Sequence, residues 1–382
     1  MIKLKNIFFI GFLFSLHLAL TAFVNSSFLS TLLKEEKVGF VYTLGFLISI
    51  VILLLIPKML SRIGNYKFLL LAVGLNAFAL LSLSVFKSIF LIIPIFMSYL
   101  ILNIMIIFSL DELLSMSSKN SSIGKIRGFY IMIISLAWVI APSISGAILS
   151  NFSFSILYFI SSLLMTSVLI ISFFSFKSLE DPKYDKTPIL ESLQIFSKNK
   201  NLVRAYKINF LLQFFYAFMV IYTPIYLNAH LGFSWTEIGG MFTIMLTPFV
   251  ILPFFVGKYS DRVGERKMLI FGFMVTSLAT LSLFFIKQPQ FWIWALLLFT
   301  TRIGASTIET MIDTYFFKHI TPENDEFVSI YRNTTPIAYI TAPLVVFLVF
   351  ALTPSFNFIY PILSAFMLYG IYLAATIKKS DI

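Results

Sequence analysis

Long apolar segments dominate the sequence and constrain its fold more than any other feature. Twelve of them can cross a membrane as helices, since a hydrocarbon core of about 30 Å needs about 20 apolar residues. The runs are too long, and the loops between them too short, for the alternating strands of a β-barrel. We therefore predict an all-α integral membrane protein. The predicted spans are 7–31, 38–57, 67–86, 89–111, 127–149, 154–176, 203–227, 236–256, 268–286, 290–314, 328–352 and 356–377.

The composition agrees with this class and excludes several kinds of site. Hydrophobic residues make up 59% of the chain and charged residues 12%, whereas a soluble domain carries about 25% charged residues. The chain has no cysteine, which excludes disulfides, thiolate metal sites and a cysteine nucleophile. Its three histidines, His17, His230 and His319, lie far apart in the sequence. We expect neither a metal ion nor a cofactor.

The lysines and arginines predict the orientation in the membrane. If the N-terminus is cytoplasmic, nearly all of them fall in cytoplasmic loops, and the other side holds only Lys34, Lys37, Lys87 and Lys287. This is the positive-inside pattern. We expect a multi-pass protein of the cytoplasmic membrane with both termini in the cytoplasm. The net charge of +11 is spread over alternate loops, so nucleic acid is not an expected partner.

One polar segment divides the chain into two parts. Residues 177–200 contain Pro182, Pro188 and a cluster of charges. We predict a six-helix bundle over 1–176, a cytoplasmic linker over 177–200 and a second six-helix bundle over 201–382. A short amphipathic helix is expected within the linker at about 189–196.

The two parts repeat one another. The loop PKMLSRIGNYK (57–67) matches GKYSDRVGERK (257–267) at an offset of 200 residues, and AWVIAP (137–142) matches AYITAP (338–343) at 201. Asp111 matches Asp313 at 202, and Arg127 matches Arg332 more loosely at 205. Six helices per half give both halves the same orientation. Parallel repeats of this kind characterise one architecture of transporters, with the substrate site near the midplane.

The loop 257–267 resembles the signature G-x-x-x-D-R-x-G-R-[RK] of the major facilitator superfamily. The matching residues are Gly257, Asp261, Arg262, Gly264, Arg266 and Lys267. In the first-half copy, Pro57 and Ser61 replace the first glycine and the aspartate. The segment 141–146 also resembles part of the exporter-associated motif G-P-x-x-G-G, since it keeps Pro142 and Gly146.

The resemblance implies a twelve-helix carrier that works by alternating access, with helices 1, 4, 7 and 10 around its cavity. The repeated loops and carboxylates predict a cytoplasmic gate in which arginines pair with Asp111 and Asp313 at the ends of helices 4 and 10. The alternative is a generic interfacial charge cluster. The candidate gate residues are Arg62, Gly64, Asp111, Arg127, Asp261, Arg262, Gly264, Asp313 and Arg332.

Ionisable residues inside spans are costly and indicate function. Arg302 lies about 16 Å from the start of helix 10 at 1.5 Å per residue, near the midplane. Glu309 follows seven positions later, on the same helical face. We predict that both belong to the translocation site; a structural ion pair with another helix is the alternative.

Polar stripes on helices 1, 4 and 7 complete the candidate site. His17 lies at mid-depth, and an imidazole, with an unperturbed pKa of about 6.5, suits a proton site. Its alternative role is a hydrogen bond to a backbone carbonyl. The candidate substrate and proton pathway is His17, Asn103, Asn209, Gln213, Tyr216, Arg302 and Glu309.

We therefore expect a secondary active transporter of a small molecule by alternating access, with proton-coupled efflux as one mode; import versus export and the coupling ion stay open, although Glu309, Asp313 and His17 favour protons over sodium. A membrane-embedded enzyme is disfavoured because the sequence contains no H-E-x-x-H, P-loop or complete G-x-S-x-G site. A non-transporting receptor with a transporter fold stays open. We expect a monomer. The substrate is open between lipophilic compounds, which suit the aromatic spans, and anions, which suit Arg302.

Overall fold

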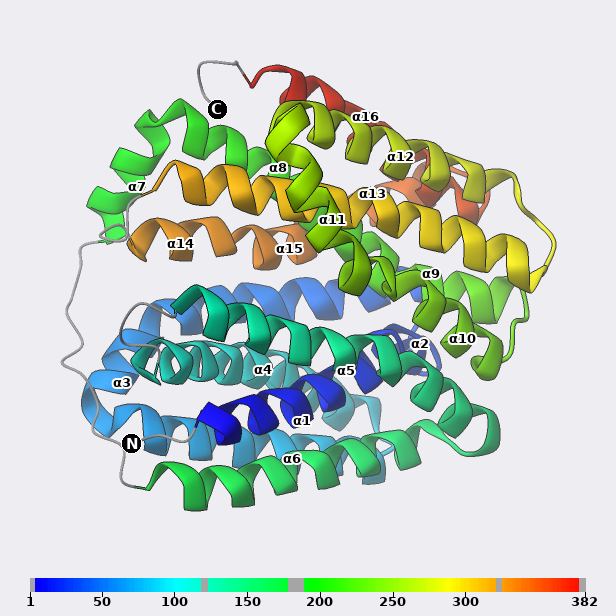
Figure 1. The fold of residues 1–382 in the computed structure, drawn as a ribbon. Helices are drawn as coiled ribbons and strands as arrows, with labels where there is room; N and C mark the ends of the chain where they lie inside the picture. Colours follow the sequence, from blue (N-terminus) through cyan, green and yellow to red (C-terminus); the bar gives the residue numbers. More distant parts are fainter. Residues whose placement is uncertain (1–3, 118–122, 178–188, 321–324, 378–382) are drawn as a thin grey trace. The chain divides into compact units, whose positions relative to one another are not determined.

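The computed structural model describes residues 4–117, 123–177, 189–320 and 325–377 (Figure 1). Within these ranges the chain is almost entirely helical and contains no strand. Twelve helices there are long and apolar enough to cross a membrane. They lie within a few residues of the predicted spans, so the predicted all-α membrane fold is confirmed.

The chain divides into two compact units, of which the first is Met1–Lys186 with Ser234–Gly239. Its long helix α3 packs against α4 and α6, and α1 packs against α4, α5 and α6. These contacts bury α1 in the middle of its neighbours. The helices are α1 (Leu4–Ala22), α2 (Asn25–Ser30), α3 (Glu35–Val85), α4 (Ile89–Ser117), α5 (Ile123–Asn151) and α6 (Phe154–Phe176).

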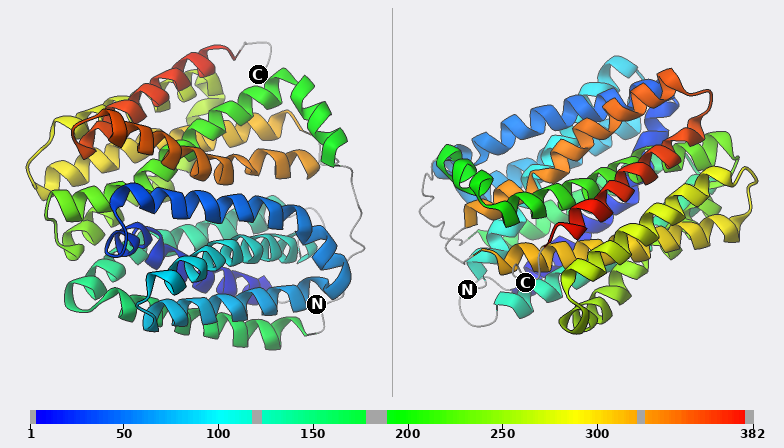
Figure 2. Two further views of the ribbon diagram at one scale, coloured as in Figure 1. Left: turned by 180° about the vertical axis from the view of Figure 1, so that it is seen from behind. Right: turned by 90° about the horizontal axis from the view of Figure 1, so that it is seen from above.

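The second unit is Thr187–Phe233 with Gly240–Ile382. In it, α8 packs against α13, α15 and α16, and α12 lies between α13 and α16; Figure 2 shows the red α16 running alongside the yellow-green α12. The elements are α7 (Ile189–Lys198), α8 (Lys200–Ile221), α9 (Thr223–Ile225), η1 (Tyr226–His230), α10 (Trp235–Leu246), α11 (Pro248–Val263), α12 (Glu265–Phe285), α13 (Phe291–Lys318), α14 (Asp325–Arg332), α15 (Thr334–Leu352), η2 (Phe356–Phe358) and α16 (Ile359–Ala375).

The repeat seen in the sequence recurs in the backbone. Gly64 interrupts α3 with φ 76° and ψ 157°, and Gly264 separates α11 from α12 with φ 84° and ψ 150°. Both conformations lie in the positive-φ region that glycine adopts without a steric penalty. Pro142 and Pro343, also paired in the sequence, each lie inside a helix.

Helix ends differ from the predictions where a helix continues beyond its predicted span. α4 continues to Ser117 and α13 to Lys318, so Asp111 and Asp313 lie within helices rather than at their ends. The predicted span 328–352 is divided, because α14 ends at Arg332 and α15 begins at Thr334. Hydropathy marks the limit of the apolar span, whereas the backbone hydrogen bonds continue past it.

Within the predicted linker the structure describes α7 (Ile189–Lys198), which confirms the short helix expected at about 189–196. Its Phe196 is buried and packs edge-on against Tyr206 of α8 and Phe327 of α14. This contact holds the amphipathic helix against the second unit. Residues 178–188 of the linker lie outside the described residues.

Candidate functional site

The second unit brings a guanidinium group, a carboxylate and a tyrosine together. The hydroxyl of Tyr216 on α8 donates a hydrogen bond to Oε2 of Glu309 on α13 at 2.7 Å. The guanidinium carbon of Arg302 lies 5.4 Å from the centre of the Tyr216 ring and 4.9 Å from that of Phe215. Tyr216 therefore contacts both charged residues, although they lie two helical turns apart.

Arg302 is buried and forms no direct ion pair among the described residues. Its side chain is 2% exposed, and neither Nε nor Nη1 has a hydrogen-bond partner among the described residues. Its electrostatic neighbours are Tyr216, Tyr339 and Glu309. An arginine at the bilayer centre costs about 2.5–3.5 kcal/mol on insertion scales. The two aromatic faces offset part of this cost, since each such contact contributes about 0.5–2 kcal/mol.

A second tyrosine–carboxylate pair follows one turn along α13. The hydroxyl of Tyr331, on α14, donates to Oδ1 of Asp313 at 2.9 Å. Accessibility increases along this face, from the buried Arg302 through the half-buried Glu309 to the exposed Asp313. The charged face thus connects a buried guanidinium to solvent-accessible carboxylates.

Close packing with α12 fixes the orientation of α13. A Cβ atom on Gly304 would lie 2.2 Å from Oγ1 of Thr276 and 2.5 Å from the carbonyl oxygen of Gly272. Glycine is required where two helices approach so closely. With this face of α13 held against α12, the face that carries Arg302 and Glu309 turns toward α8.

In the first unit, the polar residues are buried and uncharged partners surround His17. Its side chain is fully buried, and Nδ1 is bonded to the carbonyl oxygen of Phe14. Because a carbonyl only accepts, Nδ1 carries the proton and Nε2 of the neutral ring is an acceptor. The side chain of Asn103 lies within hydrogen-bonding reach of the His17 ring. Asn103 also accepts from Asn76 at 3.0 Å.

Thr21 and Asn25 lie on the same polar side of the first predicted span as His17, and they bond to other helices of the same unit. Thr21 and Tyr99 share a hydrogen bond of 2.7 Å between their hydroxyls. Tyr158 donates to Oδ1 of Asn25 at 2.8 Å. These bonds tie α1 and α2 to α4 and α6, so this part of the stripe supports the packing of the unit.

The predicted polar residues of α8 also fall into two groups, one in helix packing and one at the charged site. Asn209 donates to Oγ1 of Thr334 on α15 at 2.7 Å, whereas Tyr216 bonds to Glu309. Gln213 is half-buried between them along the helix. The structure therefore brings Tyr216, Arg302 and Glu309 together and places Asn209 in a helix–helix contact.

The candidate gate residues are described only in part. Arg62 and Arg332 are exposed, and Asp111 is half-buried. The side chains of Arg127, Asp261 and Arg262 lie outside the described part of the structure. The pairing of these arginines with the two aspartates stays a prediction.

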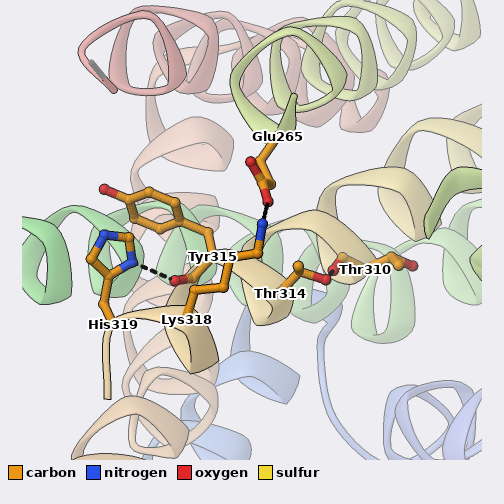
Figure 3. A network of polar contacts seen from close by, with 6 residues as sticks. All are labelled: Glu265, Thr310, Thr314, Tyr315, Lys318 and His319. Atoms are coloured by element: carbon orange, nitrogen blue, oxygen red, sulfur yellow. Dashed lines mark hydrogen bonds and ion pairs between the residues drawn. The ribbon is translucent and has the colours of Figure 1, made fainter. Parts of the chain in front are cut away.

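The structure adds an ion pair that the sequence reasoning missed. Lys318, at the end of α13, pairs with Glu265 at the start of α12, as Figure 3 shows. Glu265 is 3% exposed and directly follows the positive-φ Gly264. His319 bonds through Nδ1 to the carbonyl of Tyr315 at 2.7 Å beside this pair. An acidic residue in the first turn of a helix was the available signal.

These features define a multi-pass membrane protein with charged residues buried inside its spans. The chain belongs to the Major Facilitator Superfamily, whose sequence profile matches residues 7–343 and, in a second alignment, residues 208–378. This confirms the resemblance drawn from the signature loop. The chain is therefore a secondary transporter. No curated protein sequence matches it.

Two solved transporters share the fold. One is a bacterial homologue of the human lysosomal transporter Spinster in an inward-facing, unoccupied conformation, with a TM-score of 0.70 and 13% identity over 98% of this chain and 93% of that one. The other is a mutant of the nucleoside transporter NupG, with a TM-score of 0.80 and 12% identity over 98% of this chain and 100% of that one. At these identities the similarity shows the fold alone.

Proposed function

We propose that this transporter moves a small molecule by alternating access and couples the movement to protons bound at Glu309. The observation that carries the proposal is the placement of Glu309, a carboxylate inside a span between the hydroxyl of Tyr216 and a buried arginine. Ionisable groups in such positions characterise proton relays in transporters.

Protonation of Glu309 changes its interactions. The ionised carboxylate accepts from Tyr216 and attracts Arg302, while the protonated carboxyl loses most of that attraction. A proton therefore has different free energies in conformations that keep or break these contacts. A ligand with such a difference shifts the equilibrium between two conformations, which is what coupling requires.

Asp313 is a second carboxylate on the proposed proton pathway, between Glu309 and solvent. It lies four residues further along α13 and is exposed, with the hydroxyl of Tyr331 as donor. We place this end of α13 on the cytoplasmic side, in line with the positive-inside pattern. His17 and Asn103 of the first unit are proposed as the uncharged polar part of the substrate pathway.

We propose export across the cytoplasmic membrane as the physiological direction. Its support is the partial exporter motif around Pro142 and Gly146 in α5. Right-side-out and inside-out vesicles that contain the transporter separate the two directions. At the same imposed proton gradient, faster substrate uptake into the inside-out vesicles is the expected result; faster uptake into the right-side-out vesicles would show import.

The test of proton coupling uses proteoliposomes that contain a pH-sensitive dye. Compounds that stabilise the purified protein against heat are added one at a time, and a substrate should change the internal pH. Glu309→Gln should abolish this proton movement, while Glu191→Gln, on the exposed face of α7, should leave it unchanged. A receptor of transporter fold would bind the compound and show neither substrate nor proton flux.

A further inference from the structure

The charged site is confined to one half of the repeat. The offset of 202 residues that relates Asp313 to Asp111 in the sequence repeat makes Leu100 the equivalent of Arg302 and Ile107 the equivalent of Glu309. The first half thus builds the equivalent helix with apolar residues at both positions. The helix packing of this fold does not itself require a charge there, so Arg302 and Glu309 need a reason outside the fold.

The arginine is poorly satisfied by the protein. Nε and Nη1 lack partners among the described residues, and the Tyr216 hydroxyl is directed to Glu309. Ser306, one turn from Arg302, contacts the carbonyl oxygen of Pro248 at 3.4 Å. Buried N–H groups of a charged side chain are costly when nothing accepts from them. An acceptor from outside the protein would relieve this cost.

We infer that Arg302 binds the carboxylate of an organic monoanion, which is the substrate of the proposed transport. The planar guanidinium matches a carboxylate with two parallel hydrogen bonds. Its electrostatic neighbours are Tyr216, Tyr339 and Glu309, and none of them is a cation, so the site suits one negative charge. The rings of Phe215 and Tyr216 favour a substrate whose body is apolar or aromatic.

This inference rests on the proposed function, and it predicts whether substrate binding and protonation of Glu309 favour or oppose each other. A carboxylate at Arg302 adds negative charge near Glu309, so substrate binding and protonation of Glu309 favour each other. The other groups that act on Glu309 are Tyr216 of α8, Asp313 of α13 and Arg332 of α14. The anion and the proton then cross together with no net charge. The gradient of the acid itself sets the direction, which is compatible with export.

The test measures thermal stabilisation of the purified full-length protein by matched pairs of probes. The pairs are benzoate with benzamide, phenylacetate with phenylacetamide and hexanoate with hexanamide; inorganic phosphate is tested beside them. At least one carboxylate should raise the melting temperature of the wild type while its amide does not. Equal effects of acid and amide, no effect of any carboxylate, or an equal effect of phosphate would each overturn the inference.

Variants locate the effect at the proposed site. Arg302→Gln should lose the carboxylate-dependent shift, and Arg302→Lys should keep only a small part of it. Arg204→Gln is the matched control, because Arg204 bonds to Thr376 and Asn201 in the same unit; it should keep the full shift. A full shift in Arg302→Gln would contradict the inference. If that variant does not fold, the wild-type comparison of acids with amides still decides.

The inference and the proposed function can fail separately. If neutral amides bind as well as carboxylates while Glu309→Gln still abolishes proton movement, the proton site stands and the substrate class is wrong. If carboxylates bind through Arg302 but no substrate moves protons, the anion site stands and the proposed coupling is wrong.

Discussion

Tyr216 and Glu309 join α8 to α13 through a hydrogen bond of 2.7 Å, although 93 residues separate them in the sequence. The ring of the same tyrosine lies against Arg302. A single side chain thus contacts both the group proposed to carry the proton and the group proposed to bind the substrate. Movement of α8 relative to α13 would change both contacts together.

Removal of the Tyr216 hydroxyl should therefore alter proton coupling more than substrate binding. Tyr216→Phe keeps the aromatic face and removes the donor to Glu309. A hydrogen bond to a charged group contributes about 1.5–3 kcal/mol. The ionised carboxylate loses this stabilisation, so the pH profile of transport should move to higher pH. Tyr369→Phe, at an exposed position of α16, is the control; an unchanged profile in Tyr216→Phe would contradict the role of the hydroxyl.

The close contact between α12 and α13 should be intolerant of a single methyl group. Gly304→Ala places Cβ within 2.5 Å of the Gly272 carbonyl oxygen, and overpacking of this kind costs about 1–3 kcal/mol. The melting temperature of the purified protein should fall. Gly74→Ala is the control, because its nearest neighbour, a Leu169 methyl group, lies at 3.8 Å. Equal melting temperatures for the two variants would show that the contact is not tight.

The ion pair between Glu265 and Lys318 should stabilise the second unit. Lys318→Met leaves a carboxylate that is 3% exposed without its partner. The lysine is 51% exposed, so the expected loss is about 1–2 kcal/mol, between those of surface and buried pairs. Thermal unfolding measures it, with Lys287→Met in an exposed loop as the control. The exchanged pair, Glu265→Lys with Lys318→Glu, should recover part of the loss; a double variant less stable than both single ones would speak against the pair.

The absence of cysteine makes the topology directly testable. Lys198→Cys and Lys287→Cys introduce single thiols on what we propose to be opposite sides of the membrane. A membrane-impermeant maleimide added to intact cells should label the second variant and not the first, whereas lysed cells should show both labelled. Labelling of Lys198→Cys in intact cells would invert the orientation and place Asp313 on the outer side.

The sequence predicted the fold because hydropathy and helix length are local properties. Each of the twelve spans was found within a few residues, and the repeat recognised in the loops 57–67 and 257–267 recurs in the positive φ of Gly64 and Gly264. Helix ends were less accurate, since α13 continues past Asp313 to Lys318, beyond the predicted end of the span at 314.

The sequence predicted the members of the candidate site better than their contacts. Helical periodicity placed Arg302 and Glu309 on one face of α13, but their link through Tyr216 depends on how α8 packs against α13. The pair between Glu265 and Lys318 was missed because it joins two helix ends through side-chain reach rather than sequence spacing. His17 shows the opposite case, since its bond to the Phe14 carbonyl is local and was foreseen as one alternative.

The most direct test of the central claim compares net transport with exchange in proteoliposomes that contain Glu309→Gln. Glutamine resembles the protonated carboxyl and cannot release a proton. If Glu309 carries the coupled proton, exchange of labelled for unlabelled substrate should continue, while accumulation driven by a pH gradient should be lost. Accumulation at the wild-type level in Glu309→Gln would contradict the account.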